Sequence, residues 1–328
     1  MDLDVVFLGT SASAPTARRG TSALLIRRGG DRLLFDCGEG TQRQLLRSSI
    51  GLVDLEDVFL THLHADHYLG LPGMLKTFSL RVREQPLSVY GPPGLRDLFA
   101  ALARIVGKLT YQLELVELRA GDAVGRDGYQ VCAFPVSHGS VPAVGYALVE
   151  DERPGRFDDA AADAIGVPFG PERGRLQRGE SVTLADGRVV DPDELVGPPR
   201  TGRTIVYTGD TAPTEAIPML FHGADLLVHE ATFGNDDVER AAETGHSTAR
   251  QAGETARAAG VSLLALTHVS PRYYSPELLQ QARDVFEPTV LPRDFDTIEV
   301  PFSERGAPEL VKGGAKPDRQ AAEGVLGP

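Results

Sequence analysis

Short apolar runs separated by turn residues recur along the chain and predict a fold rich in β-strands. The first three runs, at 5–8, 22–26 and 32–35, are linked by turns that contain Gly9, Gly20 and the pair Gly29-Gly30. This spacing is typical of an antiparallel meander. Later runs of the same kind predict strands at 58–61, 87–90, 113–118, 129–134, 146–149, 204–208, 226–229 and 263–267.

Helical periodicity fills most of the intervals between these runs. The predicted helices cover 42–47, 69–80, 94–106, 214–221, 247–259 and 276–285. Two segments break the alternation. Residues 150–203 are rich in Gly, Pro and charged residues and contain no evident core element. A segment of this length is too long for an ordinary connection, so we expect it to be functional or mobile. The polar end, 304–328, is expected to be a flexible tail.

Composition narrows the class of protein. The chain has 328 residues, 41% hydrophobic content, 36 Gly and 23 Pro. This composition is typical of a loop-rich globular protein whose core needs no disulfides to be stable. Cys37 and Cys132 are far apart and neither lies in a CxxC pair, so we expect two buried thiols in a reducing cytoplasm. The N-terminus has no basic leader, and no apolar run approaches the ~18 residues of a membrane span, which predicts a soluble cytoplasmic protein without a membrane partner.

The net charge of -13 argues at first against a nucleic-acid partner, because phosphate binding draws on basic surfaces. A locally basic face can coexist with an acidic remainder, and arginines do cluster along the chain. Most single arginines are expected to be ordinary surface residues. The clusters are Arg18 and Arg19, Arg43 and Arg47, Arg81 and Arg83, and Arg173, Arg175 and Arg178.

The run from Thr61 to His67 packs three histidines and a carboxylate into six residues directly after the apolar run Val58-Phe59-Leu60. Such density is hard to explain by packing. Neutral imidazole and carboxylate are ligands suited to zinc, and two neighbouring ions can hold both the attacking and the departing oxygen of a phosphodiester. A solvated His-rich loop is the alternative, and the rest of the chain argues against it.

Further candidate ligands stand where other apolar strands end. His138, Asp210 and His268 each follow such a strand, at the position where open sheets commonly place their sites. Taken singly, each is more often an ordinary loop residue, but together they complete two metal sites. The predicted ligands are His62, His64 and His138 for one ion, Asp66, His67 and His268 for the other, and Asp210 between them.

These motifs resemble the metallo-β-lactamase superfamily and, within it, the ribonuclease Z family. The HxHxDH signature is met by 62–67, and the more discriminating matches are FDCGEGTQ at 35–42, YTGDT at 207–211, HEAT at 229–232 and THVSPRY at 267–273. The resemblance covers about 3–301. It implies an α/β protein with a four-layered αβ/βα metallo-β-lactamase sandwich, residues 1–303, and a protruding arm inserted at 150–203.

The resemblance also implies a function. It is that of a zinc-dependent endoribonuclease that removes the 3′ trailer of precursor tRNA after the discriminator base, leaving a 3′-hydroxyl on the tRNA. Two Zn2+ per subunit are implied, with Mn2+ or another divalent ion as alternatives, and so is a homodimer in which the arm of one subunit serves the other. Glu230 and His246 resemble the pair that protonates the departing ribose oxygen, and Asp66 could also serve the nucleophile. Candidate substrate contacts are Arg19, Thr41, Arg173, Arg175, Arg178 and Arg272.

One departure concerns the substrate loop near the N-terminus, which in the family reads P-x-K-x-R-N. Here 15–20 reads PTARRG and lacks the lysine and the asparagine, so the preference for particular 3′ ends stays open. The competing classes are a general phosphodiesterase of this fold, a glyoxalase-type thioesterase and a non-enzymatic binding module. A β-lactamase would supply a cysteine ligand near the bridging aspartate, and a cleavage-and-polyadenylation nuclease would be longer.

Overall fold

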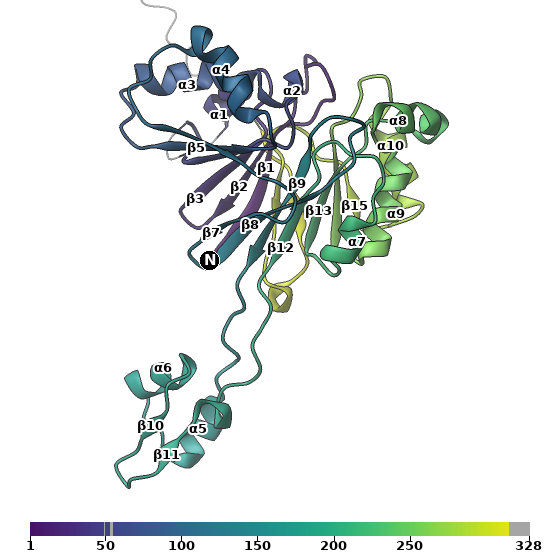
Figure 1. The fold of residues 1–328 in the computed structure, drawn as a ribbon. Helices are drawn as coiled ribbons and strands as arrows, with labels where there is room; N and C mark the ends of the chain where they lie inside the picture. Colours follow the sequence, from purple (N-terminus) through teal and green to yellow (C-terminus); the bar gives the residue numbers. More distant parts are fainter. Residues whose placement is uncertain (49, 53–54, 315–328) are drawn as a thin grey trace, which may run out of the picture.

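Two β-sheets pack face to face with helices on their outer sides (Figure 1), in a computed structural model that describes residues 1–48, 50–52 and 55–314. The first sheet has the spatial order β17 (Glu309–Val311), β16 (Thr297–Glu299), β1 (Leu3–Gly9), β2 (Ala23–Arg28), β3 (Asp31–Phe35), β4 (Asp57–Phe59), β5 (Leu87–Gly91) and β6 (Leu113–Glu117). The second has the order β15 (Thr289–Val290), β14 (Leu263–Thr267), β13 (Leu226–Glu230), β12 (Thr204–Tyr207), β9 (Val144–Glu150), β8 (Tyr129–Pro135) and β7 (Ala123–Arg126).

The apolar runs are continuous because each sheet is buried on both faces. In β1, Val5 and Phe7 point into the core between the sheets, whereas Val6 and Leu8 point into the core beneath the helices. Alternate residues of a strand face opposite sides, so a strand buried on both sides needs apolar residues throughout. The predicted meander is confirmed, since β1, β2 and β3 pair antiparallel, and β3 to β6 then pair in parallel.

Helices cover both outer faces, which makes four layers. The helices on the first sheet are α1 (Thr41–Arg47), α2 (Ala65–Tyr68), α3 (Gly70–Leu80) and α4 (Leu95–Val106). Those beside the second are α7 (Ala216–Leu220), α8 (Val238–Thr244), α9 (Ala249–Ala259) and α10 (Ser275–Arg283), and the short η2 (Asn235–Asp237) precedes α8 (Figure 1). The expected four-layered α/β sandwich is thus the observed fold.

Residues 150–203 form an arm that projects from the second sheet (Figure 1), and although no core element is evident in their sequence, they bury an apolar cluster of their own. Two extended strands lead to a head built from α5 (Asp159–Ile165), α6 (Pro171–Gln177), the hairpin β10 (Val182–Thr183) and β11 (Val189–Val190), and η1 (Pro192–Glu194). The head buries its own apolar cluster: Ala162, Val167, Leu176, Val182, Val190 and Leu195. The apolar residues are too widely spaced along this segment to reveal the cluster in the sequence.

The segment after residue 303 is also more ordered than expected. It forms η3 (Ser303–Arg305) and then β17, which pairs antiparallel with β16 at the edge of the first sheet. The predicted flexible tail is therefore wrong for 304–314, and its remainder, 315–328, lies outside the described residues. Cys37 is buried as expected, but Cys132 is only partly buried, and both are free thiols. Within the described part of the chain, no helix is long and apolar enough to cross a membrane.

Candidate functional site

The predicted ligands meet at one edge of the sandwich, where strands of both sheets end. His62 and His64 follow β4, and Asp66 and His67 lie on α2. From the second sheet, His138 follows β8, Asp210 follows β12 and His268 follows β14. Because β12, β13 and β14 run in parallel, their carboxyl ends open at the same edge, where a sheet of this kind presents its site.

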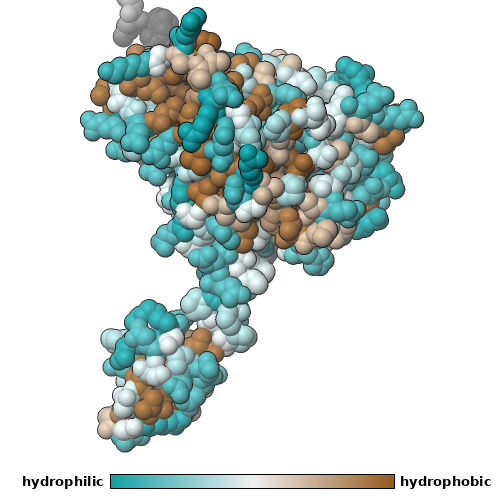
Figure 2. Space-filling view, viewed as in Figure 1, coloured by the Kyte–Doolittle hydropathy of each residue, from teal (hydrophilic) through white to brown (hydrophobic). Residues whose placement is uncertain are grey.

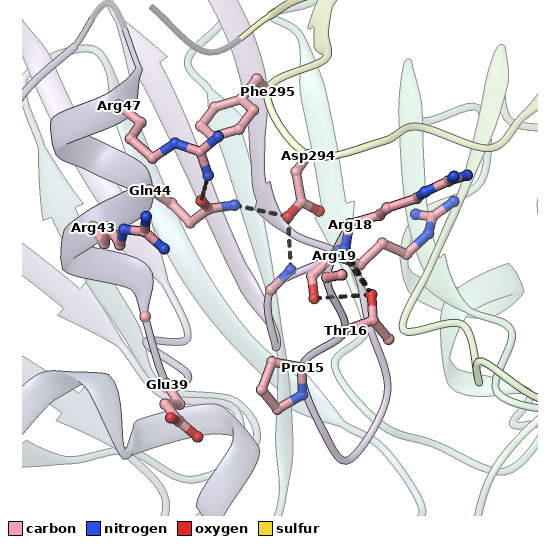
Figure 3. A pocket seen from close by; sticks show the side chains of 13 residues that line it. Pro15, Thr16, Arg18, Arg19, Glu39, Arg43, Gln44, Arg47, Asp294 and Phe295 are labelled. Carbon is pink, nitrogen blue, oxygen red and sulfur yellow. Dashed lines mark hydrogen bonds between the residues drawn. The ribbon is translucent and has the colours of Figure 1, made fainter. Parts of the chain in front are cut away.

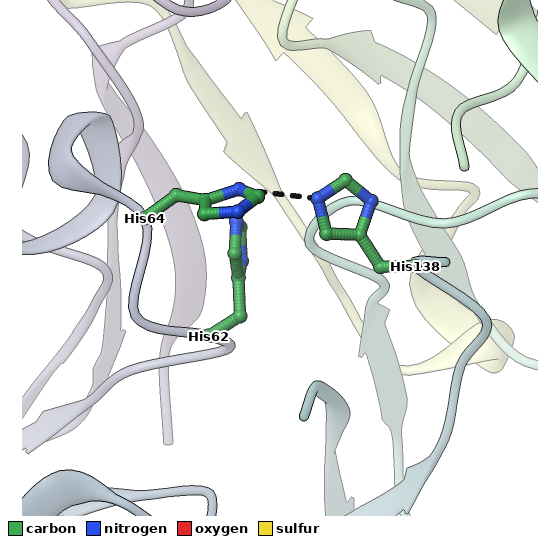
Figure 4. Close-up of side chains that lie close together, drawn as sticks. All are labelled: His62, His64 and His138. Atoms are coloured by element: carbon green, nitrogen blue, oxygen red, sulfur yellow. Dashed lines mark hydrogen bonds between the residues drawn. The ribbon is translucent and has the colours of Figure 1, made fainter. Parts of the chain in front are cut away.

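Three histidines make the first group (Figure 4). His62, His64 and His138 offer ring nitrogens that lie within 4.8 Å of one another. Nε2 of His138 is 3.2 Å from Nδ1 of His64, and the ring of His62 stands edge-on to that of His64 at 4.7 Å between centroids. Nδ1 of His138 donates to the carbonyl oxygen of Gly245 at 2.8 Å, which leaves Nε2 as the lone-pair nitrogen facing the group.

The second group combines Asp66, His67 and His268. Oδ2 of Asp66 lies 3.3 Å from Nε2 of His268 and 3.7 Å from Nε2 of His67. Asp210 stands between the two groups, with Oδ2 at 3.7 Å from Nε2 of His62 and 3.4 Å from Nε2 of His67. The backbone of His268 has a φ of 51°, an uncommon left-handed conformation for a non-glycine residue and a kind of strain that clusters at functional sites.

Several polar atoms of this cluster have no hydrogen-bond partner among the described residues. Nε2 of His62, Nε2 of His67 and Oδ1 of Asp210 are buried and lack a hydrogen bond within the described residues. Buried polar atoms are nearly always satisfied, so three of them converging on one centre indicate a further group between them. Imidazole nitrogens and carboxylate oxygens are the donor set that zinc accepts, and the side chains therefore fit a metal.

A buried carboxylate behind the cluster, Asp36, was not predicted. It accepts hydrogen bonds from Nδ1 of His67 at 2.8 Å, from the hydroxyl of Tyr207 at 2.8 Å and from the backbone N–H of Thr61 at 2.8 Å. The bond to Nδ1 keeps the lone pair of His67 on Nε2, which faces the centre. The hydroxyl of Thr61 extends this network to Nδ1 of His62 at 3.1 Å. Asp36 could have been noticed in the sequence because it lies in the FDCGEGTQ match.

The charges of the centre favour a cation. Burial by itself would lower the pKa of His67, but the carboxylates of Asp210 and Asp36 outweigh it and hold this pKa well above its ordinary value. Burial by itself would raise the pKa of Asp210, but His268 and His67 hold it well below its ordinary value. Asp36 and Asp210 therefore stabilise positive charge at His67, whether a proton or a metal ion on Nε2 carries it.

Glu230, at the end of β13, and His246, between α8 and α9, form a direct pair. Nδ1 of His246 lies 2.8 Å from Oε1 of Glu230. Burial opposes the charge of His246, but the hydrogen bond and charge of Glu230 raise its pKa to about 9. Glu230 is fully buried and is fixed further by the N–H of Thr211 and the hydroxyl of Thr232. The pair thus presents a protonated imidazole at neutral pH, and its Nε2 is the nitrogen left to meet a substrate.

Thr232 was missed in the sequence although it lies in the HEAT match. Its hydroxyl lies 2.6 Å from Oε2 of Glu230, 3.3 Å from Nδ1 of His246 and 2.9 Å from Nδ1 of His268. It therefore links the Glu230–His246 pair to the group of Asp66, His67 and His268. His229, the first residue of the HEAT match, is fully buried, and its Nδ1 lies 2.8 Å from the carbonyl oxygen of Glu230.

A basic cavity of about 470 Å³ lies between the loop at 15–20 and α1 (Figure 3). Arg43 and Arg47 border it from α1, and Arg18 from the loop. Asp294 connects the loop to α1, because its Oδ2 accepts hydrogen bonds from the N–H of Gly20 and from the side-chain amide of Gln44, both at 2.7 Å. Arginine side chains suit phosphate groups, and the loop reaches the metal centre through Ser13, whose N–H donates to Asp66 at 2.9 Å.

The residues expected to contact the substrate differ from one another in exposure and in hydrogen bonding. Arg19 donates to Thr10 and to the carbonyl oxygen of Pro292, so its guanidinium serves the loop itself. Thr41 is 1% exposed and donates to the carbonyl oxygen of Gly38, so its hydroxyl does not face a substrate in this conformation. Arg272 is exposed, four residues after the ligand His268.

The arm arginines are paired within the arm. Arg173 contacts Asp159 at 2.7 Å and also Asp163, and its side chain is mostly buried. Arg175 and Arg178 share Glu180 at 3.0 and 3.4 Å and stay about half exposed or more. Arg173 therefore stabilises the head of the arm, and only the other two of this predicted group remain open to solvent.

Comparisons with known proteins identify the family of the chain. The family model of the metallo-β-lactamase superfamily matches residues 16–268. Ribonuclease Z of Halorubrum lacusprofundi is 47% identical over 307 residues, which cover 92% of this chain and 98% of that protein. Ribonuclease Z of Myxococcus xanthus is 48% identical over 304 residues, with coverage of 92% and 98%.

A solved structure gives the same picture. The short form of human tRNase Z superposes with a TM-score of 0.66 at 30% identity, covering 91% of this chain and 99% of that one. A diphosphatase of the PhnP family superposes with a TM-score of 0.60 at 18% identity, over 92% of this chain and 98% of that one. At that identity the likeness concerns the fold alone.

Proposed function

The chain belongs to the ribonuclease Z family of the metallo-β-lactamase superfamily, and from this premise we propose that it removes the 3′ trailer from tRNA precursors. Cleavage after the discriminator base would leave a 3′-hydroxyl on the tRNA and a 5′-phosphate on the trailer. The observation that carries the proposal is the convergence of the two ligand groups and the Glu230–His246 pair at one edge of the sandwich. Residues 1–303 then act as one catalytic unit with the arm as an insertion.

Two divalent ions, zinc in the first place, are proposed as the cofactors. His62, His64 and His138 would hold one ion, Asp66, His67 and His268 the other, and Asp210 would join both. When bound, such ions polarise the phosphate and lower the pKa of water toward neutrality. The unpartnered nitrogens of His62 and His67 and the unpartnered Oδ1 of Asp210 support this assignment.

His246 is assigned the role of general acid. Hydrolysis breaks the bond between phosphorus and the ribose 3′-oxygen, and that oxygen must gain a proton to leave as a hydroxyl. His246 is protonated at neutral pH through its bond with Glu230 and keeps 13% of its side chain exposed toward solvent. Glu230 positions the ring and stabilises its charge without contacting the substrate.

Asp66 is assigned the role of accepting the proton of the attacking water. Among the carboxylates of the centre its side chain is the most accessible, 13% exposed against 3% for Asp210 and 0% for Glu230. The N–H of Ser13 fixes Oδ2 at 2.9 Å, so the carboxylate is oriented before a substrate arrives.

The arm is proposed to bind the tRNA body at a distance from the metal centre. Its head carries a cavity of about 470 Å³ bordered by Arg156, Phe169 and Gln177. Phe169 is 91% exposed, which is unusual for an aromatic side chain unless it meets a partner. In Figure 2 a brown patch lies on an otherwise mostly teal head. Arg156 is exposed, borders the same cavity as Phe169 and is suited to a phosphate contact.

We further propose a homodimer in which the arm of one subunit serves the site of the other. Brown atoms gather over the α3 and α4 region in Figure 2. Large apolar side chains there are strongly exposed, at 81% for Leu80 and 71% for both Val82 and Ile105. Exposed apolar patches of this kind mark interaction surfaces. A cytoplasmic location is proposed on the ground of the tRNA substrate alone.

The deciding experiment incubates the purified protein with a 3′-extended tRNA transcript and maps both product ends. A single cut after the discriminator base, dependent on added zinc or manganese, is expected. Cleavage of bis(p-nitrophenyl) phosphate without any cut in the transcript would favour a general phosphodiesterase, and hydrolysis of a glutathione thioester would favour the glyoxalase-type alternative.

A further inference from the structure

The base of the arm is tied to the body by a segment near the C-terminus. Arg153 lies on the strand that leaves the body and Arg200 on the strand that returns, and their backbones pair with each other. Both guanidinium groups contact Oε1 of Glu304, at 2.8 and 3.0 Å. In Figure 1 the yellow turn of η3 lies beside the point where the two strands leave the second sheet. One carboxylate therefore joins both strands of the arm to the first residues after β16.

Phe302 continues this connection into the body. The guanidinium of Arg153 lies 3.5 Å from the centre of its ring, and that of Arg203 lies 4.0 Å from it. Arg203 is 3% exposed and is held by Glu150 at 2.7 Å, while Arg28 contacts the same carboxylate at 2.8 Å. A chain of contacts thus runs from a buried ion network of the second sheet, through Phe302, to the arm.

The direction of the head is set at the root, where the two strands of the arm continue β9 and β12 and where Arg153 pairs with Arg200. The apolar cluster of the head is made by residues from 157 to 195, without a side chain of the body. The two strands are matched to each other closely, since a Cβ on Gly155 would stand 1.8 Å from the carbonyl oxygen of Gly197. The arm can therefore act as a lever whose angle is set at its root.

We propose that Phe302 and Glu304 form a latch that sets the angle of the arm and thereby positions bound tRNA relative to the metal centre. The inference rests on the proposed function of the arm. Phe302 and Glu304 are positioning residues, because they contact the root of the arm and neither the metal centre nor the head.

The geometry of the lever explains why a small change would matter. The strand from Asp151 to Phe157 spans about 20 Å at the usual rise per residue, so a rotation of roughly 10° at the root would move the start of the head by about 3.5 Å. A shift of that size moves the contacts of the head away from the tRNA body, which weakens binding and raises KM while the metal centre itself is unchanged.

Two exposed labelling sites allow the angle to be measured directly. Val189 in the head is 56% exposed and Met219 in the body is 78% exposed. Spin labels on V189C and M219C, in a Cys132→Ser background diluted with unlabelled protein, report the distance between head and body. Cys37 is buried and is left in place. Glu304→Gln is expected to broaden or shift the distance distribution, and Glu304→Asp to restore part of it.

Glu254→Gln is the matched control, because Glu254 also makes a solvent-exposed ion pair, with Arg250 at 3.1 Å on α9. It is expected to leave the distribution unchanged. In kinetics, Glu304→Gln is expected to raise KM for a 3′-extended tRNA roughly three- to tenfold, the range for losing two exposed ion pairs together, with kcat and the hydrolysis of bis(p-nitrophenyl) phosphate within about twofold of wild type. Phe302→Leu is expected to act in the same direction.

An unchanged distance distribution in both Glu304→Gln and Phe302→Leu would overturn the latch, whatever happens to tRNA processing. A changed distribution with an unchanged KM for tRNA would overturn its role in positioning. If the wild-type protein does not process tRNA, the proposed function falls, and the distance measurement still decides whether the latch exists.

Discussion

Asp36 offers the sharpest test of how the metal centre is built, because it shapes the centre without belonging to the ligand set. Its two oxygens accept from the N–H of Thr61, the ring of His67 and the hydroxyl of Tyr207, each at 2.8 Å. Asparagine at this position has one accepting oxygen and one donating nitrogen. Whichever way the amide turns in Asp36→Asn, its NH2 group must face a donor.

The expected magnitude follows from that count. The hydroxyl of Thr61 also donates to Asp36, at 3.1 Å from Oδ1. A buried donor left without an acceptor costs about 1–3 kcal/mol, and here at least one of four donors loses its partner. Weakening a hydrogen bond that orients a metal-ligating histidine typically lowers metal affinity 10–100-fold, or about 1.4–2.7 kcal/mol. We therefore expect Asp36→Asn to bind zinc at least tenfold more weakly and to lose activity that excess zinc partly restores.

The assay is a competition with a chelator of known zinc affinity, combined with metal content after dialysis and with urea denaturation. Asp57→Asn is the control. Asp57 is equally buried in the first sheet but is paired with Arg126, so its loss should lower stability and leave zinc affinity unchanged. Tyr207→Phe removes a single donor and provides a milder variant should Asp36→Asn fold poorly.

Wild-type zinc affinity in Asp36→Asn, with a fold that denatures normally, would refute the reasoning. The orientation of His67 would then come from packing and from its own ligand bond. Equal loss of affinity in Asp57→Asn would refute it as well, because the effect would reflect general destabilisation of the sheet.

Other predictions test the remaining assignments. Asp210→Ala should abolish hydrolysis and lower metal content while the protein stays folded, as checked by metal analysis and circular dichroism; wild-type turnover at full occupancy would contradict its place between the ions. His246→Ala should slow single-turnover cleavage by ~10² to 10⁴ with metal and tRNA affinity nearly intact, and an effect on KM alone would make it a binding residue. Joining Gly155 directly to Gly197, which already lie in contact, should cripple tRNA processing and spare bis(p-nitrophenyl) phosphate; loss of both activities would place the arm in the catalytic centre. Burial by itself would raise the pKa of Glu150, but its hydrogen bonds with Arg203 and Arg28 outweigh burial and lower the pKa to about 2. The ionised carboxylate should therefore stabilise the fold by about 3 kcal/mol above pH 5, and this contribution should be lost as the pH falls toward 2. Denaturation of Glu150→Gln against wild type should show a gap that closes over this range, and a constant gap would contradict the assignment.

The strands and the gathering of the ligands could be predicted from the sequence because both follow from local rules. Continuous apolar runs such as the one in β1 indicate strands buried on both faces, and a polar residue directly after such a run lies at a sheet edge. His62, Asp210 and His268 satisfied that rule, and the structure does bring them together. The very short strands, such as β15 and β16, were missed because two or three residues carry no readable period.

The structure of the arm could not be predicted from local sequence patterns. Its small head is stable because widely separated residues, Ala162, Leu176 and Val190 among them, bury one another, and no short window of sequence contains that pattern. Arg173 was expected to meet RNA, yet the fold places Asp159 and Asp163 against it. Whether a charged side chain is free depends on partners that only the folded chain supplies.

The sequence by itself determined which chemistry is possible, since the residue types of the HxHxDH run and the strand-end positions of the other ligands are readable one segment at a time. Tertiary structure alone decided how that chemistry is controlled. Asp36 lies far along the chain from Tyr207 but 2.8 Å from its hydroxyl, and Glu304 lies 151 residues along the chain from Arg153 but contacts it at 2.8 Å. Orientation depends on contacts between segments distant in sequence, and those contacts exist only once the two sheets have packed.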